Sequence, residues 1–543
     1  MRKGFHLLGA GLVAAAMLRD LQAASRFDEY TAKFAQTPDQ AAVLLSSYFG
    51  GTGTEWLTGG GFQPDGTLVL AGVALGPDLD LGPKTIVLGR DSAISPPARL
   101  PKKNKKGEPE LDKEGRPKYE PFSWLHENAT AFIARLSDDL KQIKSVTRLG
   151  WKTGGLTGAA VDKEGSIYIC GPASEGIVSL GGEVQALPVP DNGLTKGAVQ
   201  HTYLAKISPD GAKVLWVRHF KGFSGAPDIE ITANGQIKFQ GPDLRTFDAQ
   251  GKQLSLVTVP GGLGGRVAVN PKDGTYARGG EHHWSTGREP WRCPTLNIYQ
   301  PDGTLLYELY NWGGPFVGLN NLRLVSDSAV RGVCYDADGN LLIHAWSDGG
   351  NSVMYREPND VRTTSKKMSG LGFGAWGAGV LSCAYIIKIE TTHYKVAGGT
   401  LWVAYLRDKN KPNSITIKSL GFARDGSVCV AGSSAWGLIQ TGNALGKEPG
   451  GNYVAVLNKD CTSLRFSSAM PATGQAEVND GANWGIVSGA LKGKSVVLFL
   501  SGAVDKEDTY GGLLSAPAVA ARQPRFGGGL LDGHVLMLDL SAK

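Results

Sequence analysis

Along most of the chain, apolar residues come in short runs that directly follow a turn dipeptide. The pattern is clearest after Asp65-Gly66, Glu164-Gly165 and Asp425-Gly426, where aliphatic and β-branched residues run on to another glycine. A glycine preceded by Asp or Asn supplies the positive φ angles of a tight hairpin turn, and aliphatic and β-branched residues favour strands. Each copy therefore predicts a β-hairpin, whose strands we name A before the turn and B after it.

The hairpin pattern recurs seven times along the chain. In five copies a second glycine stands six residues after the turn glycine. A second hairpin, with strands C and D, accompanies most copies, as in Tyr203 to Val217 around Asp210-Gly211. Repetition of a four-stranded unit is typical of β-propellers. The four weaker copies centre on Asn234-Gly235, Asp273-Gly274, Asp338-Gly339 and Lys492-Gly493.

The two ends of the chain carry complementary incomplete units. The last unit has candidates for strands A, B and C, the third being Gly533 to Leu540, but it lacks strand D. A spare strand, Ala42 to Phe49, precedes the first unit. Pairing them completes a seventh blade and removes sheet edges that invite aggregation. The predicted fold is all-β, a seven-bladed β-propeller of four-stranded antiparallel blades, closed by pairing of the N-terminal strand with the C-terminal blade.

Several segments resemble the repeats of the bacterial seven-bladed β-propeller repeat family (SBBP), which is akin to NHL-type propellers. Thr130 to Leu136 and Asn452 to Leu457 resemble its C strand, and Ser47 to Gly53 resembles the Gly-Gly end of its D strand. The resemblance extends over most of the chain from about residue 43 and implies the same fold. It implies no particular function, because propellers host many unrelated activities.

Composition agrees with an ordered all-β domain. Of 543 residues, 76 are glycine, roughly twice the usual share, and a 20% share of charged residues is too low for a disordered polyelectrolyte. The net charge of +6 falls to about +4 without residues 1–23, which carry three positive charges and one negative. This balance does not support nucleic-acid binding.

The N-terminus has the pattern of a secretory signal peptide. Arg2 and Lys3 precede an uncharged apolar stretch from Leu7 to Leu18, and Leu21 to Ala24 offers small residues for cleavage. The stretch is too short to span a membrane, and no later one is long enough. We therefore predict a signal peptide at 1–23, an extension at 24–40, a single propeller at 41–543, and a secreted or periplasmic protein without an integral membrane span.

Most of the extra length falls in the connections between strands B and C. In a four-stranded meander these emerge on the same face as the D-A connections, so this face is predicted to carry the insertions, and long loops on rigid scaffolds often bind ligands. Ten of the 12 tryptophans lie in or beside these connections. They suit ligand recognition or small hydrophobic cores within the loops. The insertions span about 76–128, 173–200, 284–293, 350–380, 436–450 and 503–532.

Candidate site residues follow from the same register. Strand A lines the central channel and begins at the face with the insertions, which places Asp228, Glu230, Arg266, Asp327 and Arg331 near the axis. Converging charges there suit a polar ligand, although solvated channel linings are the alternative. The predicted ligand-binding residues are Glu230, Arg266, Arg331, His282, Trp484 and Trp151.

Signatures of catalysis and metal binding are missing from the sequence. There is no GxSxG elbow, no GxxxxGK[ST] loop, no HExxH and no CxxC, so we expect neither a metal nor a cofactor. The six cysteines allow at most one disulfide bridge. We expect an extracytoplasmic binding or scaffold module for a glycan, surface component or protein. A hydrolase or lyase with acid/base residues at the channel mouth is the alternative, and the oligomeric state stays open.

Overall fold

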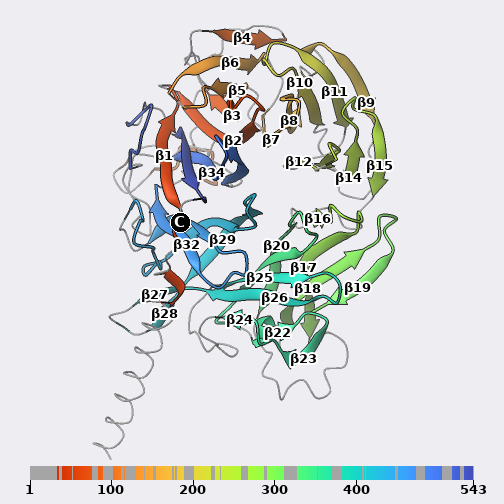
Figure 1. Cartoon of the computed structure of the whole chain (residues 1–543), viewed down its shortest axis with the longest axis vertical. Coiled ribbons are helices and arrows are strands. Elements are labelled where there is room, and N and C mark those ends of the chain that lie inside the picture. The colour runs from red at the N-terminus through yellow and green to blue at the C-terminus, as the bar shows by residue number, and fades with distance from the viewer. Residues whose placement is uncertain are drawn as a thin grey trace, which may run out of the picture.

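The computed structural model is a ring of seven β-sheet blades (Figure 1). This confirms the predicted seven-bladed propeller. The structure describes residues 33–35, 39–75, 84–89, 102–111, 115, 130–150, 155–188, 201–221, 227–257, 267–285, 290–310, 327–350, 352–369, 382–446, 450–471, 484–503, 517–525 and 527–541. Within these ranges, residues 52, 140, 174–176, 178–179, 233, 242, 407–408, 410 and 528–530 are not described.

Blades 1 to 4 follow one another along the first three fifths of the chain, each built outward from a channel-lining strand A. Blade 1 contains β2 (Thr54–Phe62), β3 (Leu68–Leu75), β5 (Thr130–Leu136), β6 (Ile143–Leu149) and the outer strand β4 (Thr85–Leu88). Blade 2 contains β7 (Gly158–Val161), β8 (Ile167–Ala173), β10 (His201–Ile207), β11 (Val214–Lys221) and the outer strand β9 (Glu183–Leu187). Blade 3 contains β12 (Asp228–Ile231), β13 (Ile237–Gln240), β14 (Leu244–Phe247) and β15 (Gln253–Val257). Blade 4 contains β16 (Val267–Val269), β17 (Tyr276–Ser285), β18 (Pro290–Tyr299) and β19 (Leu305–Leu309).

Blades 5 to 7 complete the ring, and two small hairpins and one short 3-10 helix accompany them. Blade 5 contains β20 (Ser328–Tyr335), β21 (Leu341–Ser347), β25 (Cys383–Glu390), β26 (Lys395–Trp402) and the outer strand β24 (Met368–Ser369). Blade 6 contains β29 (Ile415–Phe422), β30 (Val428–Ser434), β31 (Gly451–Leu457) and β32 (Leu464–Met470). Blade 7 contains β33 (Gly485–Leu491), β34 (Lys494–Ala503), β35 (Asp532–Asp539) and β1 (Ala42–Phe49). The remaining elements are η3 (Ser352–Tyr355), the hairpin of β22 (Arg356–Glu357) with β23 (Asp360–Thr364), and the hairpin of β27 (Ala404–Leu406) with β28 (Lys411–Asn413).

All seven A-B turns have the backbone geometry that their glycines predict. The turn glycines have φ between 77° and 86°, a region that residues with a Cβ rarely adopt. In most of these turns an Asp or Asn carboxyl or amide oxygen accepts a backbone N–H two residues on, as Asp65 does from Thr67 at 2.9 Å. The turn glycines are Gly66, Gly165, Gly235, Gly274, Gly339, Gly426 and Gly493.

The predicted ring closure is confirmed. β1 pairs antiparallel with β35 from Ala42↔Asp539 to Phe49↔Gly533, so the N-terminal strand forms the outermost strand of blade 7. The closing strands are also joined by packing, because Leu45 and Phe49 of β1 share a buried cluster with Val535 and Met537 of β35.

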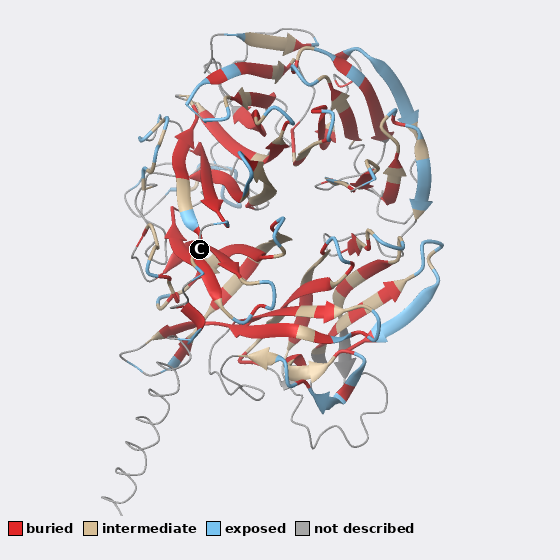
Figure 2. Cartoon of the chain, in the orientation of Figure 1, coloured by how far each residue is buried: buried red, intermediate tan, exposed pale blue. Residues whose placement is uncertain are grey.

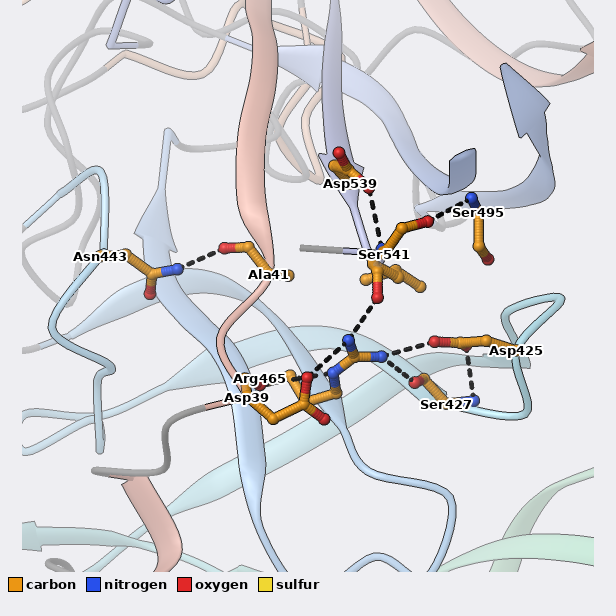
Figure 3. A network of polar contacts seen from close by, with 10 residues as sticks. Asp39, Ala41, Asp425, Ser427, Asn443, Arg465, Ser495, Asp539 and Ser541 are labelled. Carbon is orange, nitrogen blue, oxygen red and sulfur yellow. Dashed lines mark hydrogen bonds and ion pairs between the residues drawn. The ribbon is translucent and has the colours of Figure 1, made fainter. Parts of the chain in front are cut away.

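A network of polar contacts around Arg465 adds to this closure (Figure 3). Arg465 lies in β32 of blade 6 and is 5% exposed. Its guanidinium donates to Asp39 Oδ1 at 3.0 Å, to Asp425 Oδ2 at 2.5 Å, to Ser427 Oγ at 2.7 Å and to the Leu540 carbonyl at 2.5 Å. One side chain thereby connects the segment before β1, the A-B turn of blade 6 and the residue after β35.

Hydrophobic clusters fill the spaces between neighbouring blades, and their sizes differ around the ring. The cluster between blades 4 and 5 contains 21 buried residues, whereas the cluster between blades 3 and 4 contains three, Leu244, Val267 and Tyr276. A polar contact adds to the latter, since Lys238 Nζ of blade 3 donates to the Val269 carbonyl at 3.4 Å. Among the described residues, the seam between blades 3 and 4 therefore buries the least apolar surface.

The long B-C insertions have a structural role that no sequence pattern indicated: they cover the outer edges of their own blades. Three of them contribute a fifth strand parallel to strand D, namely β4 beside β6, β9 beside β11 and β24 beside β26 (Figure 1). In blade 6, Thr441 of the insertion donates its N–H to the Ser467 carbonyl at 3.2 Å. In blade 7, Ser46 and Val519 exchange two backbone hydrogen bonds of 2.9 and 3.1 Å.

Blades 3 and 4 differ from the other five. Their B-C connections are only residues 241–243 and 286–289, and within the described parts of the chain no strand pairs with the outer edge of β15 or β19. These strands are among the most exposed of the molecule (Figure 2). The predicted insertion at 284–293 is wrong, because β17 and β18 extend as one long hairpin up to the pair Ser285↔Pro290.

Candidate functional site

The inner strands line a channel that solvent reaches. β20, β29 and β33 are mostly half-buried along their length, and β12 alternates between exposed and half-buried positions. In a buried sheet such strands would be fully enclosed, so this burial pattern shows that one face of each looks into the channel.

Arg331 of β20 is a predicted site residue whose side chain contacts both an acidic and an aromatic side chain. It lies at a register shift between Val330 and Gly332 in the pairing of β20 with β21. Arg331 Nη2 is 2.9 Å from Glu281 Oε2 of blade 4, and the two side chains are 29% and 22% exposed. The guanidinium also lies over the Trp346 ring, 5.5 Å from its centroid. A cation, a carboxylate and an indole from three strands thus meet between blades 4 and 5.

A second ion pair lies at the start of blade 5. Asp327 directly precedes β20, and its Oδ1 accepts the backbone N–H of Arg292 at 2.8 Å. The Arg292 Nε and Asp327 Oδ2 atoms are 3.8 Å apart, and both side chains are partly exposed. Asp327 therefore holds the beginning of β18 against blade 5.

Asp228 and Glu230 lie on one face of β12, as the register predicts. Both are accessible to solvent, yet protein atoms of the channel wall surround them, and this desolvation raises the pKa of both carboxyls. Lys238, the cross-strand partner of Glu230, opposes the shift at Glu230, while its own pKa is lowered by burial. Gly158 allows the close approach of blade 2, because a Cβ there would lie 2.9 Å from Asp228 Oδ1.

The remaining predicted site residues are not brought together with these. Trp484 is 4% exposed and packs in the cluster between blades 6 and 7, with its ring 6.5 Å from His534, so it contributes to the core and presents no surface to a ligand. Arg266 and Trp151 lie outside the described residues. For His282 the structure describes only the backbone pairing with Cys293 in the β17–β18 hairpin.

The other tryptophans whose side chains are described divide between core and surface. Trp56, Trp216 and Trp402 lie in strands β2, β11 and β26 and are buried at 4% exposure or less, so they belong to the core. Trp436 is 50% exposed, and Trp346 is half-buried beside Arg331. Trp346 is thus the aromatic residue best placed for recognition, and its position in the B strand of blade 5 gave no sign of its contact with Arg331.

Reactive groups and metal ligands do not gather in the described part of the chain. It contains no cluster of three His, Cys, Asp or Glu side chains arranged to hold a metal ion. All six cysteines are free thiols. Burial raises the pKa of Cys383 and Cys461 to about 12, so these thiols stay protonated and unreactive near neutral pH.

A buried histidine lies in the closing strand, away from the channel. His534 of β35 is fully enclosed, and its Nε2 is 3.3 Å from Ser46 Oγ of β1. Desolvation lowers its pKa to about 4. The ring therefore stays neutral above that pH, which suits packing rather than proton transfer near neutrality.

Comparison with known proteins leaves the function open. No family model matches the chain, and no curated protein matches it. Among solved structures, a protein of unknown function from Dyadobacter fermentans is 12% identical with a TM-score of 0.36, covering 93% of this chain and 100% of its own. The C-terminal WD40 domain of Sif2 is 10% identical with a TM-score of 0.36, covering 91% and 99%. An ulvan lyase of a polysaccharide lyase family, solved with -[GlcA(1-4)Rha3S]-, is 11% identical with a TM-score of 0.37, covering 84% and 92%. The ring of seven blades makes the chain a β-propeller, and these distant likenesses carry no argument about its activity.

Proposed function

We propose that this protein is a binding module that holds a polar ligand, of which a glycan is the best-suited class, at the channel mouth between blades 4 and 5. The observation that carries the proposal is the grouping of Arg331, Glu281 and Trp346, with Arg331 and Glu281 partly open to solvent. An indole face stacks on the apolar face of a sugar, while a guanidinium and a carboxylate donate to and accept from its hydroxyl groups.

The test is a glycan-array screen followed by isothermal titration with the best binder. Arg331→Glu and Trp346→Ala should each weaken binding at least tenfold, a loss of about 1.4 kcal/mol or more. Asp65→Ser changes an exposed A-B turn at the opposite end of the blades and serves as the control, with unchanged affinity expected. A ligand that binds equally to all three variants, or that maps to the A-B turns, would refute the proposal.

A catalytic function is the second candidate, favoured by Asp228 and Glu230. Their raised pKa values would keep a fraction of each carboxyl protonated at mildly acidic pH, as general acid catalysis requires. Release of reducing ends or unsaturated products from acidic polysaccharides would be measured for the intact protein and for Asp228→Asn and Glu230→Gln. Turnover that both variants retain would exclude these residues as acid and base.

Two further proposals concern origin and location. We propose membership in the bacterial SBBP-repeat propellers because Thr130 to Leu136 and Asn452 to Leu457, which resemble the family's C strand, form the third strands β5 and β31. We propose export because of the basic and apolar N-terminal pattern. N-terminal sequencing of the mature protein should find a start near residue 24. Among the described residues, no helix is long and apolar enough to cross a membrane.

A further inference from the structure

Blades 2 and 3 differ at their outer edges, because a further strand covers strand D only in blade 2 among the described residues. Val217 of β11 and Leu256 of β15 hold equivalent places, each the fourth residue of its D strand. Val217 is fully buried and lies opposite Val184 of the covering strand β9, whereas Leu256 is 41% exposed. Leu254, which the register shift between Gln253 and Ser255 leaves without a partner in β14, is 48% exposed. The apolar face of β15 is thus built like that of β11 but has no covering strand among the described residues.

We propose that β15, the outer edge of blade 3, binds an extended segment of a partner protein that adds to the sheet as a fifth strand. An exposed edge strand presents backbone N–H and C=O groups to solvent and accepts an added strand readily. Proteins usually protect such edges, and described segments of this chain cover five of the seven. This site lies on the outer wall and is separate from the ligand site proposed at the channel mouth.

The chain itself defines the chemistry of the occupant. All three internal fifth strands run parallel to their D strand and pair over two to five residues. In β9 an aliphatic side chain, Val184, covers the residue equivalent to Leu256. The expected partner segment is therefore an extended peptide, parallel to β15, with a β-branched or aliphatic residue facing Leu256.

The proposed site is continuous with an interface that already exists in the molecule. β9 covers β11 and ends at Leu187, and the carbonyl of the next residue, Pro188, accepts a hydrogen bond of 2.5 Å from Arg245 Nη2 of blade 3. Arg245 in turn donates to Gln253 Oε1 of β15 at 2.9 Å. The covered edge of blade 2 therefore leads directly to the open edge of blade 3.

β19 of blade 4 is the other open edge and is less suited. Tyr307 of β19 packs against Tyr394 in a turn of blade 5, with ring centroids 4.6 Å apart. Part of the apolar surface of β19 is thus already used by the neighbouring blade, whereas Leu254 and Leu256 of β15 are exposed together.

A peptide with the sequence of residues 181–189, which contains β9, is the probe. Its fluorescein-labelled form is titrated with the full-length protein and read by anisotropy. Saturable binding is expected, weakened at least tenfold by Leu256→Lys, because a charge on the edge face opposes strand addition. Leu215→Lys, at an equally exposed position (42%) on the covered edge of blade 2, is the matched control and should bind like the unmodified protein. A peptide carrying Val184→Lys should fail to bind.

Three results would overturn the proposal. The first is the absence of saturable binding at millimolar peptide, and the second is binding that Leu256→Lys leaves unchanged. The third is a protein that sediments as a dimer and becomes monomeric with Leu256→Lys, since a second copy would then occupy the edge. Leu256 is exposed, so the variant should fold, and an unchanged melting temperature verifies this.

Discussion

Arg465 gives the sharpest test of how the ring is closed. Arg465→Met removes the guanidinium while keeping a long apolar side chain in the same space. The substitution leaves the Leu540 carbonyl and the Asp425 carboxylate without their charged donor. The Arg465 side chain that it replaces is only 5% exposed. Because the contacts connect the segment before β1, blade 6 and the residue after β35, the loss should weaken the closure itself.

The expected loss follows from the burial of each partner. Breaking a buried ion pair by removing one partner costs about 3–5 kcal/mol. The Asp425 side chain is 28% exposed and the Asp39 side chain 57%, so the Asp39 contact adds at most about 1 kcal/mol and the Asp425 contact falls below the full buried value. We therefore expect Arg465→Met to lower the free energy of unfolding by about 3 kcal/mol.

The assay is equilibrium unfolding in urea, followed by tryptophan fluorescence. The matched control is Lys492→Met, because Lys492 of blade 7 pairs with Asp138 of blade 1 at 3.1 Å and likewise connects neighbouring blades. The side chains of Lys492 and Asp138 are both about half exposed, so this ion pair should contribute no more than about 0.5 kcal/mol to stability. If Arg465→Met loses no more than Lys492→Met, the network does not hold the closure and the reasoning from burial is refuted.

Three further predictions concern the closing blade and the longest insertion. Deleting residues 533–543 should abolish cooperative unfolding of the whole ring, since it removes nearly all of β35, leaves β1 without its partner and opens one edge of β34; a truncated protein that melts like the intact one would contradict this. Stability should fall by about 3 kcal/mol as the pH drops from about 6.5 to about 4, because His534 has a pKa of about 4 in the folded protein and about 6.5 when unfolded, so protons favour the unfolded state. The measurement is urea unfolding at the two pH values, and His534→Phe should remove this part of the pH dependence. Replacing residues 95–120 with a short Gly-Ser linker should leave the melting temperature nearly unchanged, because the described residues 102–111 contact one another and are exposed; a loss of several degrees would show that the insertion packs on the ring.

The repeat and its closure could be predicted because local chemistry specifies both. A glycine in each A-B turn has a positive φ that few other residues adopt, so seven turns could be counted from the sequence. The strands after the turns either alternate apolar and polar residues or are apolar over short lengths. The spare strand at one end of the chain matches the missing strand at the other. These signals lie within a few residues of each other or at the chain ends, where no knowledge of packing is needed.

The covering strands could not be predicted because their partners are distant and their signals are short. β4 is four residues long within a long insertion, and it pairs with β6 more than fifty residues later. β24 consists of two residues. Such a segment has no periodicity to distinguish it from a loop, and its parallel pairing follows from where the insertion crosses the edge of the blade.

The sequence singled out Arg331 but not the side chains that contact it. The register of strand A placed Arg331 at the channel mouth, and the structure adds Glu281 and Trp346 from two B strands. Their meeting depends on how blades 4 and 5 pack, which no single strand encodes. For Trp484 the sequence left ligand recognition and a role in the core both open, and the cluster between blades 6 and 7 encloses it.

The distribution of insertions also accounts for the blade edges that no described segment covers. Blades 3 and 4 have short B-C connections, uncovered outer edges among the described residues, and the smallest cluster between them. An insertion covers the edge of its own blade, so where no described segment lies beside strand D an apolar side chain stays exposed, as at Leu256. A partner strand at β15 would bury that face and would supply from outside what the other blades obtain from their own insertions. Binding there should therefore protect the backbone amides of β14 and β15 from hydrogen exchange more than those of β10 and β11.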